Sequence, residues 1–333
     1  MYSIIKKLLF QLDPETAHHF SLTSLKIAHS LKLIRIHNQQ SSHQTTLCGL
    51  TFPNRIGLAA GFDKNGDYID ALASLGFGFI EVGTVTLQPQ DGNPKPRIFR
   101  LTEDQAIINR LGFNNKGSDY LIKRLKKINY RGILGINIGK SHSTELRHAS
   151  DEYVQLFTKI YPYASYVTVN ISSPNTKELR ELQHGDLLST LLRNLKNAQT
   201  MLNQQHNKYV PLVIKIAPDL TSAELAQMTE ILLDEKIDAV IATNTTLQRD
   251  GASDPLASQP GGLSGKPLRA HSTAIIKQLS LLLADKIPII ASGGILNVHD
   301  AHEKLNAGAQ LIQLYTGLIY SGPSLIKTLV ENI

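Results

Sequence analysis

Residues 210–216 read VPLVIKI, a run of aliphatic side chains interrupted only by Lys215. A strand that is apolar on both faces is typical of a parallel sheet covered by helices. Seven further runs of this kind alternate with segments of helical period, at residues 54–60, 78–84, 132–138, 166–171, 238–243, 287–292 and 310–315. Eight strands alternating with helices predict an α/β fold, the (β/α)8 TIM barrel.

The barrel domain is expected to span residues 37–333, which exceeds the roughly 250 residues typical of this fold. The surplus fits two insertions, at residues 85–112 after the second strand and at 247–264 after the sixth. A doubly wound open sheet is the alternative, and it usually carries a GxGxxG fingerprint after its first strand. The first run here continues into AAGFDKNG (59–66), so the sequence favours the barrel.

Residues 1–36 differ from the rest and predict an extension of two short amphipathic helices. Apolar residues recur at helical spacing from Ile4 to Leu12, and Asp13-Pro14-Glu15 is a typical helix start. The segment holds five basic and two acidic residues. A cationic amphipathic segment binds anionic membrane surfaces, although it also fits a helical cap on the bottom or side of the barrel.

The composition excludes several classes of protein. With 42% hydrophobic and 19% charged residues and a net charge of +6, the chain is expected to fold rather than to be disordered. No run reaches the roughly 18 apolar residues of a spanning helix, and no secretory cleavage site is visible. The single cysteine, Cys48, excludes an internal disulfide, an iron–sulfur cluster and a cysteine-rich zinc site, so no metal is expected. Basic residues are scattered, and no nucleic-acid partner is predicted.

Polar residues at the ends of the apolar runs are the candidates for an active site, which in this fold lies at the carboxyl ends of the strands. A carboxamide offers a donor and an acceptor in one plane, which suits the edge of a pyrimidine or a flavin. A single asparagine at a strand end often caps a turn, but capping is a poor explanation for the whole set. The set comprises Asp63, Lys64, Thr84, Asn137, Asn170, Lys215, Thr243, Asn244 and Thr245.

Two further features indicate an anionic ligand. Lys215 lies among aliphatic residues, so its ammonium either meets an anion at the barrel mouth or extends to water along its packed stem. SGGI (292–295) and YTGL (315–318) follow the last two strands, where barrels commonly bind a phosphate. GILGINIGKS (132–141) lacks the spacing of a Walker loop, because Leu134 stands where a glycine is required, and a nucleotide triphosphatase is therefore excluded.

Ten motifs together resemble the dihydroorotate dehydrogenases, and in particular their membrane-associated, quinone-using class. The similarity covers essentially the whole chain, including FQLDPETAH (10–18). The motifs are NRIGLAAGFDKNG (54–66), EVGTVT (81–86), PKPRIFRL (94–101), INRLGFNN (108–115), VNISSPNT (169–176), IKIAPDL (214–220), ATNTT (242–246), GGLSGKPL (261–268), IIASGGI (289–295) and QLYTG (313–317).

The resemblance implies that FMN is held at the barrel mouth and that (S)-dihydroorotate is oxidised to orotate in de novo pyrimidine (UMP) biosynthesis. The implied flavin-binding residues are Ala60, Gly61, Phe62, Asp63, Lys64, Thr84, Asn137, Asn170, Lys215, Thr243, Gly265, Gly294, Tyr315 and Thr316. The implied orotate-binding residues are Lys64, Asn109, Arg110, Leu111, Gly112, Phe113, Asn170, Asn175, Asn244 and Thr245.

The resemblance also implies that Ser173 is the catalytic base and that a membrane quinone accepts the electrons. Soluble members of the family have cysteine at the position of Ser173, so no iron–sulfur partner subunit is expected. His18 and Arg100 are expected near the quinone head, with the protein bound peripherally to the cytoplasmic face of the cell membrane. A tRNA-binding dihydrouridine synthase would also be a flavin barrel but uses a cysteine base, and a non-enzymatic membrane adaptor would explain only residues 1–36.

Overall fold

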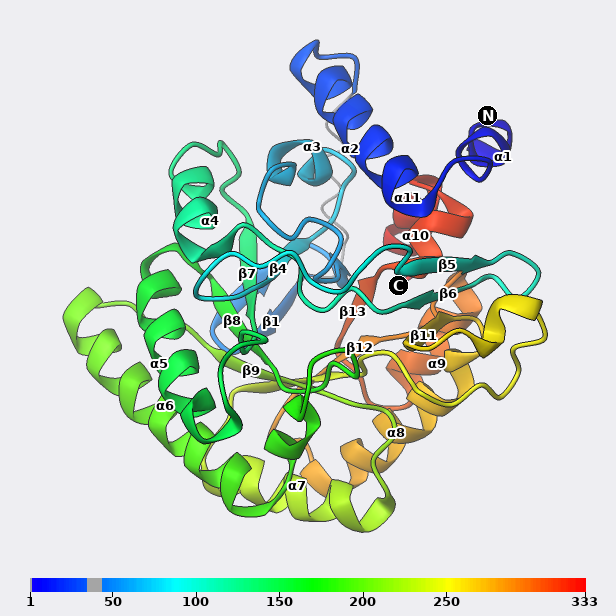
Figure 1. Ribbon diagram of the computed structural model, residues 1–333. Coiled ribbons are helices and arrows are strands. Elements are labelled where there is room, and N and C mark those ends of the chain that lie inside the picture. Colours follow the sequence, from blue (N-terminus) through cyan, green and yellow to red (C-terminus); the bar gives the residue numbers. More distant parts are fainter. Residues whose placement is uncertain (1, 35–43) are drawn as a thin grey trace.

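A closed barrel of parallel strands forms the centre of the computed structural model, which describes residues 2–34 and 44–333 (Figure 1). Each barrel strand overlaps one of the predicted runs, so the predicted TIM barrel is confirmed. The alternative open sheet is wrong, because the last strand pairs with the first and closes the ring. The strands are β3 (Ile56–Leu58), β4 (Phe79–Val85), β7 (Ile133–Ile138), β8 (Tyr166–Asn170), β9 (Leu212–Ile216), β10 (Ala239–Ala242), β12 (Ile289–Ser292) and β13 (Leu311–Leu314).

Helices surround the barrel (Figure 1), and they bury leucine-rich faces against it. In the longest of them, buried leucines recur at helical spacing from Leu188 to Leu202, and α7 begins with a capping box between Thr221 and Glu224. The helices are α3 (Ile69–Ala73), α4 (Gly117–Leu125), α5 (Ala149–Ile160), α6 (Gly185–His206), α7 (Ser222–Asp234), α8 (Leu268–Leu283), α9 (Val298–Asn306), α10 (Thr316–Ser321) and α11 (Ser324–Asn332).

Aromatic rings fill the amino-terminal half of the barrel. A Cβ atom on Gly57 would lie 2.2 Å from the ring of Phe79, and one on Gly135 would lie 2.2 Å from the ring of Tyr166, so glycine leaves the space that these rings occupy. The hairpin of β1 (Thr45–Leu47) and β2 (Leu50–Phe52) adds Phe52, whose ring centroid is 5.2 Å from that of Phe79. This end of the barrel is therefore packed core, and the carboxyl end is left for ligands.

The two predicted insertions pair with each other. The first contains β5 (Ile98–Leu101) and β6 (Ala106–Asn109), and the second contains η4 (Pro255–Ser258) and β11 (Gly262–Gly265). These strands form an antiparallel sheet in the order β11-β6-β5, in which Gly262 is paired with Asn109. The sheet brings Asn109, far from the barrel strands in sequence, to the barrel mouth.

The predicted N-terminal helices are present as α1 (Tyr2–Leu9) and α2 (Pro14–Ser30), and they stand out from the barrel near α10 and α11 (Figure 1). Asp13 caps α2 as predicted, since its Oδ1 accepts a 3.0 Å hydrogen bond from the Thr16 amide. The Tyr2 hydroxyl donates to the Ile319 carbonyl at 2.6 Å, which anchors α1. The predicted domain boundary after residue 36 lies outside the described residues. No helix in the described part of the chain has the length and hydropathy needed to cross a bilayer.

Candidate active site

A cavity at the carboxyl ends of the barrel strands brings most of the predicted site residues together. It is lined by residues at the carboxyl ends of β3, β4, β8, β9, β10, β12 and β13 or in the loops that follow these strands. The predicted residues at its wall are Ala60, Gly61, Lys64, Thr84, Asn109, Leu111, Gly112, Phe113, Asn170, Ser173, Asn175, Lys215, Thr243, Asn244, Thr245, Gly265, Gly294, Tyr315 and Thr316.

Four of the residues predicted to bind FMN or orotate lie elsewhere. Phe62 and Asp63 line a second cavity, and the Asp63 carboxylate accepts hydrogen bonds from the backbone amides that precede α3. Asn137 is fully buried behind the cavity wall. Arg110 points toward the insertion loops, where its guanidinium donates to Gln259 Oε1 at 3.1 Å and to the Pro96 carbonyl at 2.8 Å.

The strand-end amides are fixed by hydrogen bonds to one another. Asn137 Oδ1 accepts from Thr84 Oγ1 at 2.6 Å and from Asn170 Nδ2 at 3.3 Å. Asn170 Oδ1 accepts from the Ser172 amide, as a turn cap would, and also from Asn244 Nδ2 at 3.3 Å. Asn170 therefore caps a turn and also belongs to the network, which holds the amides in set orientations.

Glu81 is a central residue of the site that the sequence analysis missed. Its carboxylate is fully buried and accepts from Asn137 Nδ2 at 2.8 Å, from the Tyr166 hydroxyl at 2.9 Å, from Thr168 Oγ1 at 3.1 Å and from Gln313 Nε2 at 2.7 Å. Gln313, also missed, lines the cavity, and its buried Oε1 has no partner among the described residues. Both residues interrupt apolar strands, which is the signal that identified Lys215.

Lys215, which is buried, and Lys64, which is half-buried, supply positive charge without a hydrogen-bond acceptor in the described structure. Lys215 is only 6% exposed, which does not fit an ammonium that extends to water. Burial lowers the pKa of Lys215, and the Glu81 carboxylate opposes this shift. Burial lowers the pKa of Lys64 to about 8. A cation that is wholly or partly removed from water and has no partner is costly, so both positions favour an anionic ligand.

The loop after β12 offers free backbone donors. The N–H groups of Gly293, Gly294 and Ile295 have no hydrogen-bond acceptor within the described residues. Gly294 has φ +73°, and a Cβ atom there would lie 2.4 Å from Arg269 Cα, so only glycine lets this loop pack against the start of α8. Free N–H groups at this place in a barrel match the phosphate-binding arrangement.

Ser173 lies in the loop after β8, with its hydroxyl at the cavity. The side chain is 5% exposed, and Oγ accepts a 3.2 Å hydrogen bond from the Asn175 amide. The hydroxyl proton has no acceptor among the residues that the structure describes. Asn175 Nδ2 donates to the Asn109 carbonyl at 3.1 Å, which links this loop to β6.

A second cavity, of about 630 Å³, lies between the N-terminal helices and the barrel and includes His18 and Arg100 in its lining. His18 Nε2 is 2.9 Å from the Phe62 carbonyl, and burial together with the nearby Lys64 charge lowers its pKa to about 4. Arg100 Nη1 donates to the Leu9 carbonyl at 3.0 Å. Lys64, Asn109, Leu111 and Tyr315 line both cavities, so the two adjoin.

The family model described as dihydroorotate dehydrogenase matches residues 42–333 of this sequence. The chain belongs to the dihydroorotate dehydrogenase family. The family consists of flavin-dependent oxidoreductases, and the resemblance found in the sequence is therefore confirmed.

Relatives named dihydroorotate dehydrogenase (quinone) are similar over the full chain. The protein of Glaesserella parasuis is 56% identical, over 100% of this chain and 99% of its own length. The protein of Chromobacterium violaceum is 55% identical, over 98% of this chain and 95% of its own length. Among solved structures of dihydroorotate dehydrogenase, the Eimeria tenella enzyme in complex with ferulenol has a TM-score of 0.87 at 36% identity, covering 96% of this chain and 90% of that one. The ligand-free form of the Eimeria tenella enzyme has a TM-score of 0.86 at 37% identity, and the match covers 96% of this chain and 94% of that one.

Proposed function

We propose that the protein oxidises (S)-dihydroorotate to orotate in pyrimidine (UMP) biosynthesis, with FMN as the bound cofactor and a membrane quinone as electron acceptor. The observation that carries this proposal is the arrangement at the barrel mouth. One cavity contains a serine hydroxyl, two lysines and several fixed carboxamides, and it adjoins a second cavity that reaches the N-terminal helices.

The cavity residues fit FMN. The free N–H groups of the loop after β12 suit its single phosphate. The unpartnered Oε1 of Gln313 suits a ring N–H, and the buried ammonium of Lys215 suits negative charge on the reduced ring. When bound, FMN would take two electrons from the substrate and pass them to the quinone.

The residues that face dihydroorotate would bind and orient it. Lys64 would pair with the substrate carboxylate, which favours the charged form of the amine and would raise the Lys64 pKa from about 8. Asn109, Asn175 and Asn244 would bind the ring amides. Their side chains are already oriented, because Asn175 Nδ2 donates to Asn109 Oδ1 at 3.3 Å and Asn244 Nδ2 donates to Ser172 Oγ at 3.0 Å.

Ser173 would accept the proton that leaves the ring carbon next to the oxidised one. The Asn175 amide already donates to its Oγ, which holds the hydroxyl oxygen in place. A serine hydroxyl is a weak base, so Ser173 must pass this proton on, and its own O–H is free to do so.

The second cavity is proposed to admit the quinone. His18 would be neutral at physiological pH, so it can donate or accept a hydrogen bond at a quinone head without introducing charge. Apolar side chains of α1 and α2 that are exposed, such as Ile4, Leu8 and Phe20, would contact the cytoplasmic face of the cell membrane.

The absorbance spectrum of the purified protein tests the proposal, measured before and after anaerobic addition of dihydroorotate. We expect a flavin spectrum that bleaches on addition, and FMN as the cofactor released by heat. Recovery of FAD, or protein without flavin, would contradict the cofactor assignment. A flavin that dihydroorotate does not bleach would contradict the assignment of dihydroorotate as the substrate.

A further inference from the structure

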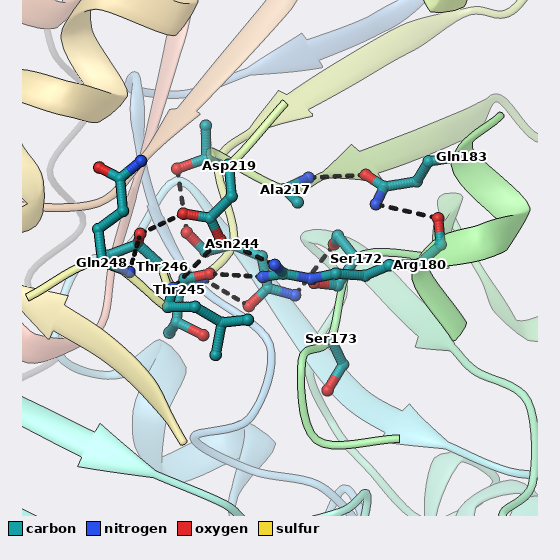
Figure 2. Close-up of polar contacts among 12 residues, drawn as sticks. Ser172, Ser173, Arg180, Gln183, Ala217, Asp219, Asn244, Thr245, Thr246 and Gln248 are labelled. Carbon is teal, nitrogen blue, oxygen red and sulfur yellow. Dashed lines mark hydrogen bonds and ion pairs between the residues drawn. The ribbon is translucent and has the colours of Figure 1, made fainter. Parts of the chain in front are cut away.

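Arg180 connects three loops at the barrel mouth. It lies in η3 (Leu179–Gln183), and its Nε donates to the Ser172 carbonyl at 3.1 Å. Its Nη1 bonds Asp219 Oδ2 at 2.8 Å, and its Nη2 donates to the Thr245 carbonyl at 3.1 Å. Figure 2 shows the guanidinium among these partners, which belong to the loops after β8, β9 and β10. A planar guanidinium presents donors in fixed directions, so the three loops are held in one geometry.

Asp219 extends this connection. Its Oδ1 accepts a hydrogen bond from Thr246 Oγ1 (Figure 2), and its Oδ2 accepts from the Leu247 amide at 3.1 Å. The ion pair with Arg180 is largely shielded from solvent, since the two side chains are 21% and 16% exposed. The Arg180–Asp219 pair therefore binds the loop after β10 at consecutive residues.

The residues that the pair holds are neighbours of the proposed chemistry. Ser172 precedes Ser173, whose hydroxyl makes no contact with Arg180 (Figure 2). Ser172 Oγ also accepts from Asn244 Nδ2 at 3.0 Å, which couples the serine loop to the asparagine proposed to bind the ring. The pair thus acts on the spacing between the two loops and not on the ligand itself.

We infer that the Arg180–Asp219 pair is a positioning pair that sets the distance between the Ser173 hydroxyl and the substrate ring held by Asn244 and Thr245. The inference rests on the proposed function. The loop after β10 has a second anchor, because Thr246 and Leu263 exchange backbone hydrogen bonds of 3.1 and 2.8 Å. Loss of Arg180 is therefore expected to displace Ser173 more than the ring-binding amides.

The test uses full-length, flavin-loaded protein with Arg180→Gln, Arg180→Lys, Asp219→Asn and the Arg180→Gln/Asp219→Asn double variant. Arg193→Gln is the matched control, since Arg193 pairs with Glu235 at 3.0 Å and is 64% exposed. Stopped flow measures the rate at which dihydroorotate bleaches the flavin, and calorimetry measures the orotate Kd. Substrate deuterated at the carbon that loses the proton, or at the one that is oxidised, gives the isotope effect of each step.

We expect Arg180→Gln to slow bleaching by about 10- to 100-fold, the size of effect that a misplacement near 1 Å produces. The orotate Kd should stay near that of wild type, and the isotope effect should rise only at the carbon that loses the proton. Arg180→Lys should recover part of the rate, because it keeps the pairing with Asp219. The double variant should be no slower than the slower single variant, since both changes break the same unit.

Wild-type rates in the Arg180 and Asp219 variants would overturn the inference. So would orotate affinity that falls in proportion to the rate with unchanged isotope effects, because that pattern indicates general damage to the site. Ser173→Ala in the same assay separates the two proposals. If Ser173→Ala bleaches slowly while the Arg180 variants react normally, only the positioning role fails. If Ser173→Ala reacts at the wild-type rate, the proposed base itself fails.

Discussion

Gln313 donates a 2.7 Å hydrogen bond from Nε2 to the buried carboxylate of Glu81, while the Oε1 of this cavity-lining side chain has no partner in the described structure. The same carboxylate accepts from Asn137, which in turn accepts from Thr84 at the cavity wall. Glu81 thereby fixes polar groups on β13 and β7, although it does not line the cavity itself.

Glu81→Gln should lower the free energy of unfolding by about 2–4 kcal/mol, because a carboxamide replaces one acceptor by an N–H group that faces donors. Urea denaturation followed by circular dichroism measures the change. The control is Glu145→Gln, since Glu145 is 64% exposed and its pair with Arg147 lies on the surface. Equal stability of the Glu81 variant and wild type would show that the network is not important for folding.

Ser173→Ala should slow bleaching of the flavin by dihydroorotate by roughly 10² to 10⁴, as expected for loss of a positioned base, while orotate still binds. Ser172→Ala should have a milder effect on this rate and should weaken orotate binding instead, because Ser172 Oγ contacts Asn170 and Asn244. Anaerobic stopped flow and calorimetry separate the two effects. A wild-type rate in Ser173→Ala would rule out its role as the base.

Lys215→Met should lower the reduction potential of the bound flavin or weaken FMN binding, since the buried cation otherwise stabilises negative charge on the reduced ring. Equilibrium titration with a reference dye gives the potential, and gel filtration followed by heat release gives the flavin content. An unchanged potential at full flavin occupancy would leave Lys215 with a packing role only.

The pKa of His18 predicts a pH dependence of stability. The folded pKa of about 4 lies below the ordinary value of 6.5, so between these values the unfolded chain binds more protons. The free energy of unfolding contributed by His18 therefore falls as the pH is lowered from 6.5 toward 4. In His18→Gln, the loss of stability between pH 7 and about pH 4.5 should be smaller than in wild type. An equal loss of stability in His18→Gln and wild type over this range would contradict the prediction.

Leu8→Glu should weaken binding to anionic vesicles, because Leu8 is 61% exposed on α1 and would enter the membrane interface. Flotation with vesicles that contain anionic lipid measures the bound fraction. Leu281→Glu is the control, since Leu281 is 76% exposed but lies on α8. An equal loss in both variants would indicate a general effect of charge rather than a docking face on α1.

The barrel strands could be predicted because each is a local apolar run, and the register of a closed parallel barrel brings the polar residues at their ends together. The sheet of β5, β6 and β11 could not be predicted from local patterns, since it pairs Ala106 with Gly265, which lies far away in the sequence. The contact of Arg180 with Asp219 likewise depends on how loops meet in space. Glu81 and Gln313 could have been found by treating every polar residue within an apolar strand as Lys215 was treated.

The glycines inside the barrel have a consequence for how sequences of this family can diverge. A side chain at position 57 or 135 fits only if Phe79 or Tyr166 becomes smaller, because each ring occupies the space next to its glycine. A larger residue at the glycine would clash with the ring, and a smaller residue in place of the ring would leave a cavity. Gly57 with Phe79 and Gly135 with Tyr166 should therefore be inherited as pairs. An alignment of relatives in which one member of a pair varies freely against a constant partner would argue against this coupling.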